Sequence, residues 1–318
     1  VILPGLSENA SDYPPYALAG AALEAGWHVA IYVRRGLSGL PLTSPHPFCL
    51  RGTDDLHAVL KHLKAAYPEA PLVAMGLSTG AGIVLRYVET YTGEQNLLAA
   101  AAAVDAGVDW VENWAWFEKH HPQMSQNFLI KKMKSVVAKN TEVLRAGGVD
   151  VAGVLAAPSY QDFFKRLHSR TLAPFTQANW EAAEEGADYL QWASPSRRCP
   201  EAITVPTFIL LSKSDYVMQP TSRARHRANA LANANVVVCE TRGGSHTMRC
   251  EGLAGGGKWM GQVCLEFATQ VLKEKQLLMS EIADSQKLKL GIYTRACDRH
   301  DSCSSLAHEG KSGKKSVS

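Results

Sequence analysis

Ser78, Asp215 and His246 are the residues whose types and order in this chain could perform nucleophilic catalysis. A serine hydroxyl is a weak nucleophile near neutral pH and needs a base within hydrogen-bond reach, which an imidazole can supply. A carboxylate can fix the imidazole tautomer and stabilise the protonated ring. We therefore expect Ser78 to act as nucleophile, His246 as general base and acid, and Asp215 as the carboxylate that orients His246.

The nucleophile lies in a G-x-S-x-G motif between an apolar run and a helix-like segment. The run is Leu72–Met75, and the motif is Gly76-Leu77-Ser78-Thr79-Gly80. A tight strand-to-helix turn leaves no room for side chains beside the serine, which explains both glycines. The alternative is an ordinary turn in which the serine only caps the helix. The strand before the motif and the helix after it favour the catalytic interpretation.

Asp215 and His246 each follow an apolar run that predicts a strand. The runs are Val205–Leu211 and Val236–Cys239. Parallel strands end at one edge of a sheet, so the three side chains can converge there. The order Ser, Asp, His is the order of the α/β-hydrolase triad. Asp105 follows the predicted strand 97–104 and is a rival candidate for the acid of the triad, and we rank it second.

An oxyanion needs hydrogen-bond donors beside the serine. Val1–Leu3 predicts a short strand, and the Pro4-Gly5 turn after it would bring the Leu6 N–H towards the substrate. The residue after the nucleophile supplies the second donor in this architecture, which is the Thr79 N–H. Without Ser78, an ordinary Pro-Gly turn would be the better interpretation of this loop.

Strand-like and helix-like segments alternate along the first part of the chain, which is typical of a parallel α/β sheet. Apolar residues at helical spacing with Thr53 as N-cap indicate one of the helices. The predicted strands are 1–3, 27–33, 72–75, 97–104, 205–211 and 236–239, and the predicted helices are 16–25, 54–67, 81–91, 220–233 and 259–273.

The alternation stops between Asp105 and Pro200, where the chain is helical and rich in aromatic residues. Such an insertion between two strands predicts a cap that offers an apolar acyl pocket. We therefore divide the chain into a first core part (1–104), a helical cap (105–200), a second core part (201–275) with the acid and histidine, and a polar tail (276–318) expected to be disordered.

Composition excludes several classes of protein. The 318 residues are 46% hydrophobic with a net charge of +3, which is globular and too weakly basic to argue for nucleic-acid binding. Seven cysteines without C-x-x-C spacing predict reduced thiols and an intracellular location. The chain contains no run of 18 apolar residues, so we predict no membrane-spanning helix in it.

The adjacent His120 and His121 face different sides of a helix, so we expect no metal site. The chain starts inside an apolar run, and we expect it to be truncated at its N-terminus.

Several segments together resemble AB hydrolase family four. They are LPGLSEN (3–9), YVRRGLSGLPL (32–42), the stretch 52–88 around the serine, YLQWASP (189–195), VPTFILLSKSD (205–215) and GGSH (243–246). The family includes abhydrolase-domain lipases and esterases, YheT-like hydrolases and fungal medium-chain alcohol acyltransferases. The resemblance covers residues 1–273 and implies an α/β-hydrolase fold, the triad above and ester or lipid substrates. It also implies membrane association, since many eukaryotic members carry an N-terminal anchor. The family usually has Gly at the position of Glu8, and here Ser245 separates Gly244 from His246.

These features predict a serine carboxylesterase or lipase that needs no cofactor and forms an acyl-enzyme on Ser78. Its substrates would be lipid-like or short- to medium-chain acyl esters. One alternative is an alcohol acyltransferase that uses the same triad. Another is a non-catalytic ligand-binding protein with a hydrolase fold, because fold does not determine function.

Overall fold

The computed structural model describes residues 1–6, 8–168, 189–195, 202–249 and 259–281. Residues 1–271 form one compact unit that contains the sheet and every residue of the predicted site. Residues 272–318 form a second unit, of which 272–281 are described and are helical.

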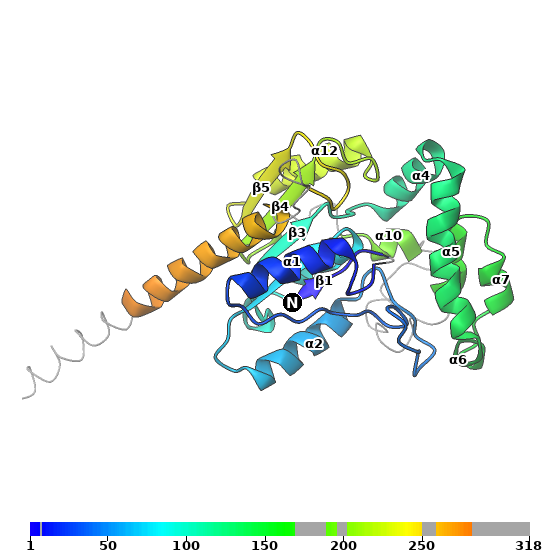
Figure 1. Ribbon diagram of the computed structural model, residues 1–318, viewed down its shortest axis with the longest axis horizontal. Coiled ribbons are helices and arrows are strands. Elements are labelled where there is room, and N and C mark those ends of the chain that lie inside the picture. Colours follow the sequence, from blue (N-terminus) through cyan, green and yellow to red (C-terminus); the bar gives the residue numbers. More distant parts are fainter. Residues whose placement is uncertain (7, 169–188, 196–201, 250–258, 282–318) are drawn as a thin grey trace, which may run out of the picture. The chain divides into compact units, whose positions relative to one another are not determined.

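A five-stranded parallel sheet forms the centre of the first unit, with its strands in the order β1-β2-β3-β4-β5 (Figure 1). The strands are β1 (Ile2–Leu3), β2 (Leu72–Leu77), β3 (Leu98–Val104), β4 (Thr207–Ser212) and β5 (Val236–Thr241). All residues of β2 and β4 are buried, which is the pattern of strands covered on both faces. The strands run in the same direction, so the residues that follow β2, β4 and β5 emerge at one edge.

Helices cover both faces of the sheet. On one face, α2 (Thr53–Ala66), α3 (Thr79–Thr90) and α12 (Pro220–Leu231) share an apolar cluster with alternate strand residues. On the other face lie α1 (Tyr13–Glu24) and the helix that begins at residue 259. Gly261 lets these two helices approach closely, since a Cβ there would lie 2.8 Å from the Ala21 Cβ. The Phe267 ring stacks on Phe208 of β4 at 5.5 Å.

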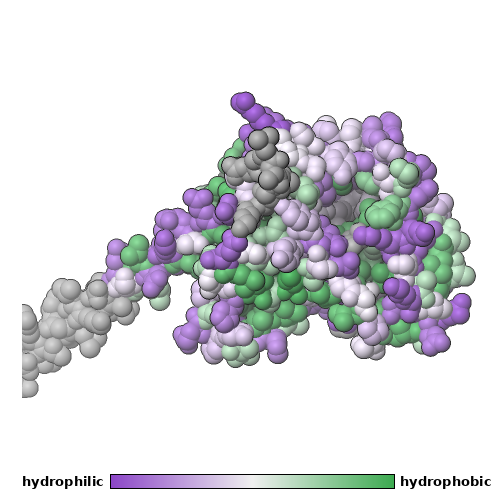
Figure 2. Space-filling model, in the orientation of Figure 1, coloured by the Kyte–Doolittle hydropathy of each residue, from purple (hydrophilic) through white to green (hydrophobic). Residues whose placement is uncertain are grey.

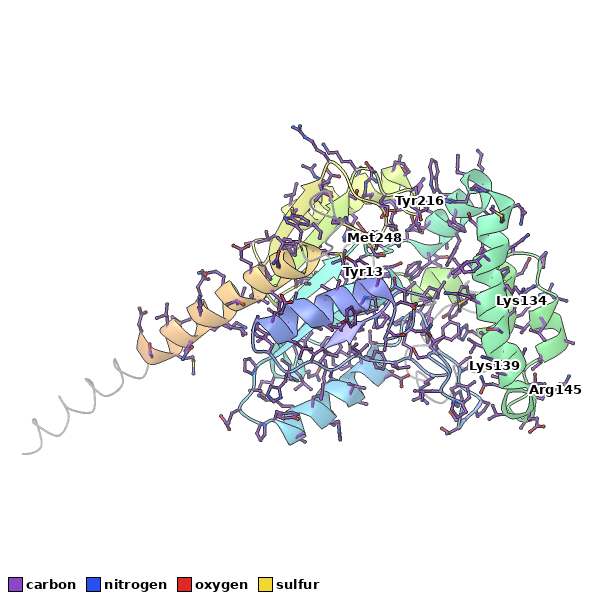
Figure 3. The ribbon with its side chains drawn as sticks, viewed as in Figure 1. Tyr13, Lys134, Lys139, Arg145, Tyr216 and Met248 are labelled. Atoms are coloured by element: carbon purple, nitrogen blue, oxygen red, sulfur yellow. The ribbon has the colours of Figure 1, made fainter. Side chains whose placement is uncertain are left out.

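A second apolar cluster joins the long connection between β3 and β4 to residues from the segment 6–50. Its aromatic rings pack on one another, and Trp114 stacks on Tyr160 with centroids 4.5 Å apart. Lys134 ties two parts of the cluster together by donating to the Ala157 carbonyl at 2.8 Å (Figure 3). The helices are α4 (Trp110–His120), α5 (Gln123–Lys139), α6 (Thr141–Ala146), α7 (Val151–Leu155), α8 (Tyr160–His168) and α10 (Tyr189–Ala193), and a 3₁₀ turn, η1 (Gly93–Gln95), precedes β3. Assignment of 105–200 as a cap domain stays a prediction, and its residues 169–188 and 196–200 lie outside the described part.

Three local predictions were wrong. Residues 27–33 do not form a strand: only Ile31 pairs, with Ile2, because β1 is two residues long and offers no longer ladder. Thr53 is not the N-cap of α2, because the helix begins there and Gly52 precedes it with φ 22°. Residues 276–281 are helical, because good helix formers extend a helix that has already started. The remainder of the predicted tail, 282–318, lies outside the described residues.

Hydrophobic surface gathers over and below α1 on the face shown in Figure 2. Three side chains of α1 contribute to the exposed apolar surface: Tyr13, Tyr16 and Leu23. Within the described residues, no helix combines the length and the hydropathy that crossing a bilayer requires.

Candidate active site

Ser78 occupies the sharp turn between β2 and α3. Its backbone has φ 52° and ψ −113°, a conformation that costs a non-glycine residue of order 1–3 kcal/mol. A Cβ at Gly76 would lie 2.5 Å from Ala81, and one at Gly80 would lie 2.6 Å from the Pro4 carbonyl oxygen. Both flanking positions must therefore be glycine for the turn to close. The Ser78 N–H donates to the Val104 carbonyl at 2.9 Å, which anchors the strained residue to β3.

His246 joins Ser78 to Asp215 through its two ring nitrogens. Nε2 lies 2.8 Å from the Ser78 Oγ, and Nδ1 lies 2.8 Å from Asp215 Oδ2. The other carboxylate oxygen of Asp215 accepts from two backbone amides, those of Val217 at 2.8 Å and Met218 at 3.1 Å. The loop after β4 therefore fixes the carboxylate, and the carboxylate fixes the imidazole.

The pKa shifts of His246 and Asp215 agree with this hydrogen-bonded arrangement. Burial lowers the pKa of His246, but the charge and hydrogen bond of Asp215 outweigh it, with smaller contributions from Asp105 and Glu8, so the pKa is raised above its ordinary 6.5. Burial raises the pKa of Asp215, but His246 and the two amides outweigh it, so the pKa is held below its ordinary 3.8. Asp215 therefore stays ionised beside an imidazole that can accept a proton.

Asp105, the rival acid, is engaged elsewhere. Its carboxylate is 1% exposed and forms a bidentate pair with Arg249, in which Nη2 donates to Oδ1 at 2.7 Å and Nη1 donates to Oδ2. Oδ2 also accepts from the Thr247 N–H at 2.8 Å. Asp105 thus holds the backbone next to His246 rather than its ring. Ligand atoms of Asp105, Asp215 and His246 lie within 4.8 Å of one another, but the neighbouring Arg249 guanidinium makes the group a poor fit for a cation.

The two predicted oxyanion donors flank the serine. Thr79 begins α3, so its N–H belongs to the first turn, where backbone donors have no intrahelical acceptor. Leu6 is buried and lines the same cavity as Ser78. The loop that carries Leu6 is held from two sides: the Gly5 N–H donates to Glu8 Oε2 at 2.5 Å, and the Arg34 guanidinium donates to the Gly5 carbonyl.

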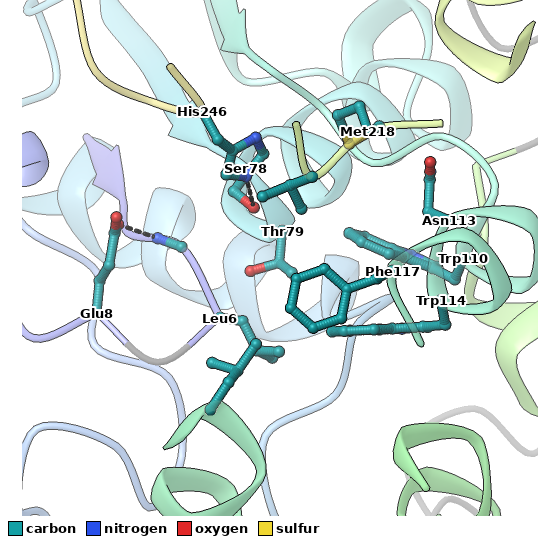
Figure 4. Close-up of a pocket in the computed structure, with 13 residues that line it drawn as sticks. Leu6, Glu8, Ser78, Thr79, Trp110, Asn113, Trp114, Phe117, Met218 and His246 are labelled. Atoms are coloured by element: carbon teal, nitrogen blue, oxygen red, sulfur yellow. Dashed lines mark hydrogen bonds between the residues drawn. The ribbon is translucent and has the colours of Figure 1, made fainter. Parts of the chain in front are cut away.

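A cavity of about 160 Å³ opens at the Ser78 hydroxyl (Figure 4). One side of it is an apolar wall, and the other side carries Glu8 and Leu6. The apolar wall consists of Trp110, Trp114, Phe117, Leu129, Val217 and Met218. A hydroxyl beside an apolar wall and two amide donors can receive an acyl group, with its carbonyl oxygen at the amides and its hydrocarbon part at the aromatic rings.

Comparison with known families decides the classification. A family model described as Hydrolase_4, serine aminopeptidase S33, matches residues 1–252. The chain belongs to the Hydrolase_4 family.

Relatives of this Hydrolase_4 chain include enzymes named for lipid substrates. It is similar to the phospholipase ABHD3 of Mus musculus, with 28% identity over 80% of this chain and 58% of the relative. It is also similar to the monoacylglycerol lipase ABHD2 of Danio rerio, with 23% identity over 90% of this chain and 67% of the relative. The chain thus spans about three fifths of the ABHD3 sequence it matches.

Among solved structures, the esterase Pf2001 of Pyrococcus furiosus aligns with a TM-score of 0.53 at 14% identity, covering 85% of this chain and 80% of that chain. At this identity the likeness concerns the fold alone. Together with the parallel sheet and the family match, it shows that the Hydrolase_4 chain has the α/β-hydrolase fold.

Sequence reasoning missed three charged residues of this Hydrolase_4 site. Arg34 lies in a segment that we noted only for its resemblance to the family, Arg249 lies in none of the segments that we singled out, and Glu8 was noted only as a departure from the related family. An arginine that directly follows an apolar segment inside a recognisable motif was the available signal for Arg34. No local pattern pointed to the pairing of Arg249 with Asp105, since 144 residues separate them.

Proposed function

We propose that this chain is a serine hydrolase that cleaves carboxylic esters of lipid-like or short- to medium-chain acyl groups. The observation that carries the proposal is the chain of two 2.8 Å hydrogen bonds from Ser78 through His246 to Asp215 at the mouth of an apolar cavity. Relatives named as a phospholipase and a monoacylglycerol lipase support the choice of ester over other acyl substrates.

In the first half-reaction, the Ser78 Oγ attacks the ester carbonyl carbon while its proton passes to His246 Nε2. The carbonyl π pair moves onto oxygen, and the N–H groups of Leu6 and Thr79 donate to the resulting oxyanion. Asp215 accepts from the Nδ1–H and stabilises the imidazolium. When the tetrahedral intermediate collapses, the C–O bond to the alcohol breaks and His246 returns the proton to the departing oxygen.

In the second half-reaction, water replaces the alcohol. His246 removes a proton from water as its oxygen attacks the acyl-enzyme carbonyl, and the same two amides hold the second oxyanion. Collapse of this intermediate breaks the bond to Ser78, whose Oγ recovers its proton from His246. The products are one carboxylic acid and one alcohol per ester, and the enzyme returns to its starting state.

The cavity size bears on the acyl group. A cavity of about 150 Å³ in a protein core accommodates a benzene-sized guest, and the cavity beside Ser78 is about 160 Å³. Acyl groups of about four to six carbons should therefore bind without rearrangement of the apolar wall, whereas longer chains would need additional space.

The direct test is hydrolysis of p-nitrophenyl butyrate by purified protein, compared with the p-nitroanilide amide of the same acyl group. We expect ester turnover that falls by at least about a thousandfold in Ser78→Ala. Ser135→Ala, an exposed serine on α5, serves as the matched control and should retain full activity. Turnover of the amide at the rate of the ester would instead favour the peptidase activity in the family's description.

Acyl transfer to an alcohol is the second candidate, because the same acyl-enzyme would react with an alcohol that enters in place of water. Product analysis with p-nitrophenyl butyrate in the presence of ethanol separates the two reactions. We expect butyric acid as the main product. Ethyl butyrate in excess over butyric acid at low ethanol concentration would assign the chain to acyl transfer.

A further inference from the structure

Arg34 is a buried cation bound to neutral oxygens. Only 3% of its surface is exposed, and burial lowers the pKa of its guanidinium below the ordinary value. Within the described residues, no carboxylate lies within ion-pair distance of Arg34. Removing a charge from water is costly unless hydrogen bonds compensate for it. The position of those compensating bonds shows what the guanidinium holds.

The guanidinium connects two segments that are far apart in the sequence. Nη1 donates to the Thr79 Oγ at 3.1 Å, and Nη2 donates to the Pro4 carbonyl at 3.3 Å and to the Gly5 carbonyl. Thr79 is the first residue of α3, and Pro4 and Gly5 belong to the loop after β1. One planar group therefore sets the spacing between the two segments that supply the predicted oxyanion donors.

Peptide geometry then sets the direction of one donor. The Gly5 carbonyl and the Leu6 N–H belong to the same peptide group, which is planar and trans, so the two bonds point in opposite directions. Because the carbonyl points at Arg34, the Leu6 N–H points away from Arg34. Leu6 and Ser78 line the same cavity, and the Leu6 N–H is needed on the side of that cavity where the Ser78 hydroxyl lies (Figure 4).

The preceding peptide group shows the same polarity. Its carbonyl, Pro4 O, faces Arg34, and its N–H, that of Gly5, donates to the Glu8 carboxylate, which lines the cavity. Two successive amides thus present carbonyls to the guanidinium and N–H groups towards the cavity side. A hydrogen bond to a carbonyl also polarises its amide and strengthens the N–H of the same group as a donor.

We propose that Arg34 is a positioning residue of the oxyanion hole, which holds the Gly5–Leu6 peptide and Thr79 so that both N–H groups meet the oxyanion. This proposal rests on the proposed hydrolase function. Arg34 acts through the backbone and does not touch the substrate. Its loss should therefore weaken binding of the tetrahedral oxyanion far more than binding of the ground state.

The test compares Arg34→Met with Arg35→Met as the matched control. Arg35, the next residue, pairs with Asp55 at 2.7 Å and is one-third exposed. For each variant we would measure kcat and KM for p-nitrophenyl butyrate and the inhibition constant of a short-chain alkyl trifluoromethyl ketone, which forms a tetrahedral oxyanion on the serine. A butyl ether without a carbonyl reports ground-state binding.

We expect Arg34→Met to lower kcat by about 10²–10³ and to weaken the ketone by a similar factor. KM and the binding of the ether should change less than about threefold, and Arg35→Met should resemble the wild type. Arg34→Lys should recover part of the loss. Ketone affinity and kcat within threefold of wild type in folded Arg34→Met would overturn the proposal, as would equal weakening of the ketone and the ether.

If Arg34→Met fails to fold, Thr79→Ala removes one of the oxygens that the guanidinium holds and keeps the backbone N–H. The same pattern with a smaller amplitude is expected, and an unchanged ketone affinity would overturn the proposal. Wild-type protein that forms no ketone adduct would instead contradict the proposed hydrolase function itself, which distinguishes the two failures.

Discussion

Replacing Asp215 by Asn should reverse the tautomer of His246 while leaving the site almost unchanged in shape. Oδ1 of Asp215 accepts from the amides of Val217 and Met218, so the Asn carbonyl oxygen must take this position. The Asn NH₂ group then lies where Oδ2 lies now, 2.8 Å from His246 Nδ1. A donor at that position makes Nδ1 an acceptor and places the ring proton on Nε2. The nitrogen that faces Ser78 can then no longer accept the serine proton.

The expected magnitude follows from this change of tautomer. The equivalent substitution in a serine protease triad lowers kcat by about 10⁴, and we expect a similar loss for Asp215→Asn with little change in thermal stability. The assay is steady-state hydrolysis of p-nitrophenyl butyrate, with the melting temperature measured on the same preparations.

Asp105→Asn is the matched control, because it changes the rival carboxylate in the same way. It leaves Arg249 buried without its counter-ion, which costs about 3–5 kcal/mol and lowers the melting temperature by roughly 6–20 °C. It leaves both hydrogen bonds of His246 in place, so kcat of the folded protein should stay within about tenfold of wild type. The reverse result, a large loss of kcat in Asp105→Asn with activity retained in Asp215→Asn, would refute the assignment of the acid.

Three further predictions concern charge, backbone space and cavity shape. Activity in a pH–rate profile should rise through a midpoint above 6.5, because the His246 imidazole must be neutral to accept the serine proton and its pKa is raised. Glu8→Gln should lower that midpoint, because it removes a nearby negative charge that raises the pKa of His246. Gly80→Ala should cost about 1–3 kcal/mol of unfolding free energy and most of the activity, because its Cβ meets backbone carbonyls. Gly20→Ala in α1 has open space around it and should stabilise the protein by up to about 1 kcal/mol. A denaturant titration measures both changes, and the opposite order of stabilities would contradict this packing. Leu129→Ala should shift the preferred p-nitrophenyl ester to a longer acyl chain, and Phe128→Ala, an exposed neighbour outside the cavity wall, should leave the preference unchanged.

The fold could be predicted where local patterns agree with tertiary context. β2 and β4 both occur where apolar runs predict them. β2 begins at the predicted residue and ends two residues later than predicted, and β4 begins two residues later and ends one residue later than predicted. Residues 27–33 have the same local character, but their pairing depends on the length of β1, which no local pattern contains. Helix ends are similar: α2 can begin at Thr53 or at Asp54, and the loop before the helix decides between them.

The candidate site divides in the same way. Ser78, Asp215 and His246 could be placed at one sheet edge because the parallel topology requires it, and their hydrogen bonds occur there. Arg34 and Glu8 could not be assigned, because, apart from the Thr79 hydroxyl, their partners are backbone groups of a loop whose conformation the sequence does not reveal. Side chains that bind backbone carbonyls or amides leave no complementary residue type in the sequence to indicate the pair.

The most direct test of the central claim is covalent labelling of the folded protein with a fluorophosphonate, followed by mass spectrometry of the intact chain and its peptides. We expect one adduct, on Ser78, that disappears in Ser78→Ala and forms much more slowly in His246→Ala. Folded wild-type protein that takes up no label, or a label that persists in Ser78→Ala, would contradict the assignment of Ser78 as the nucleophile.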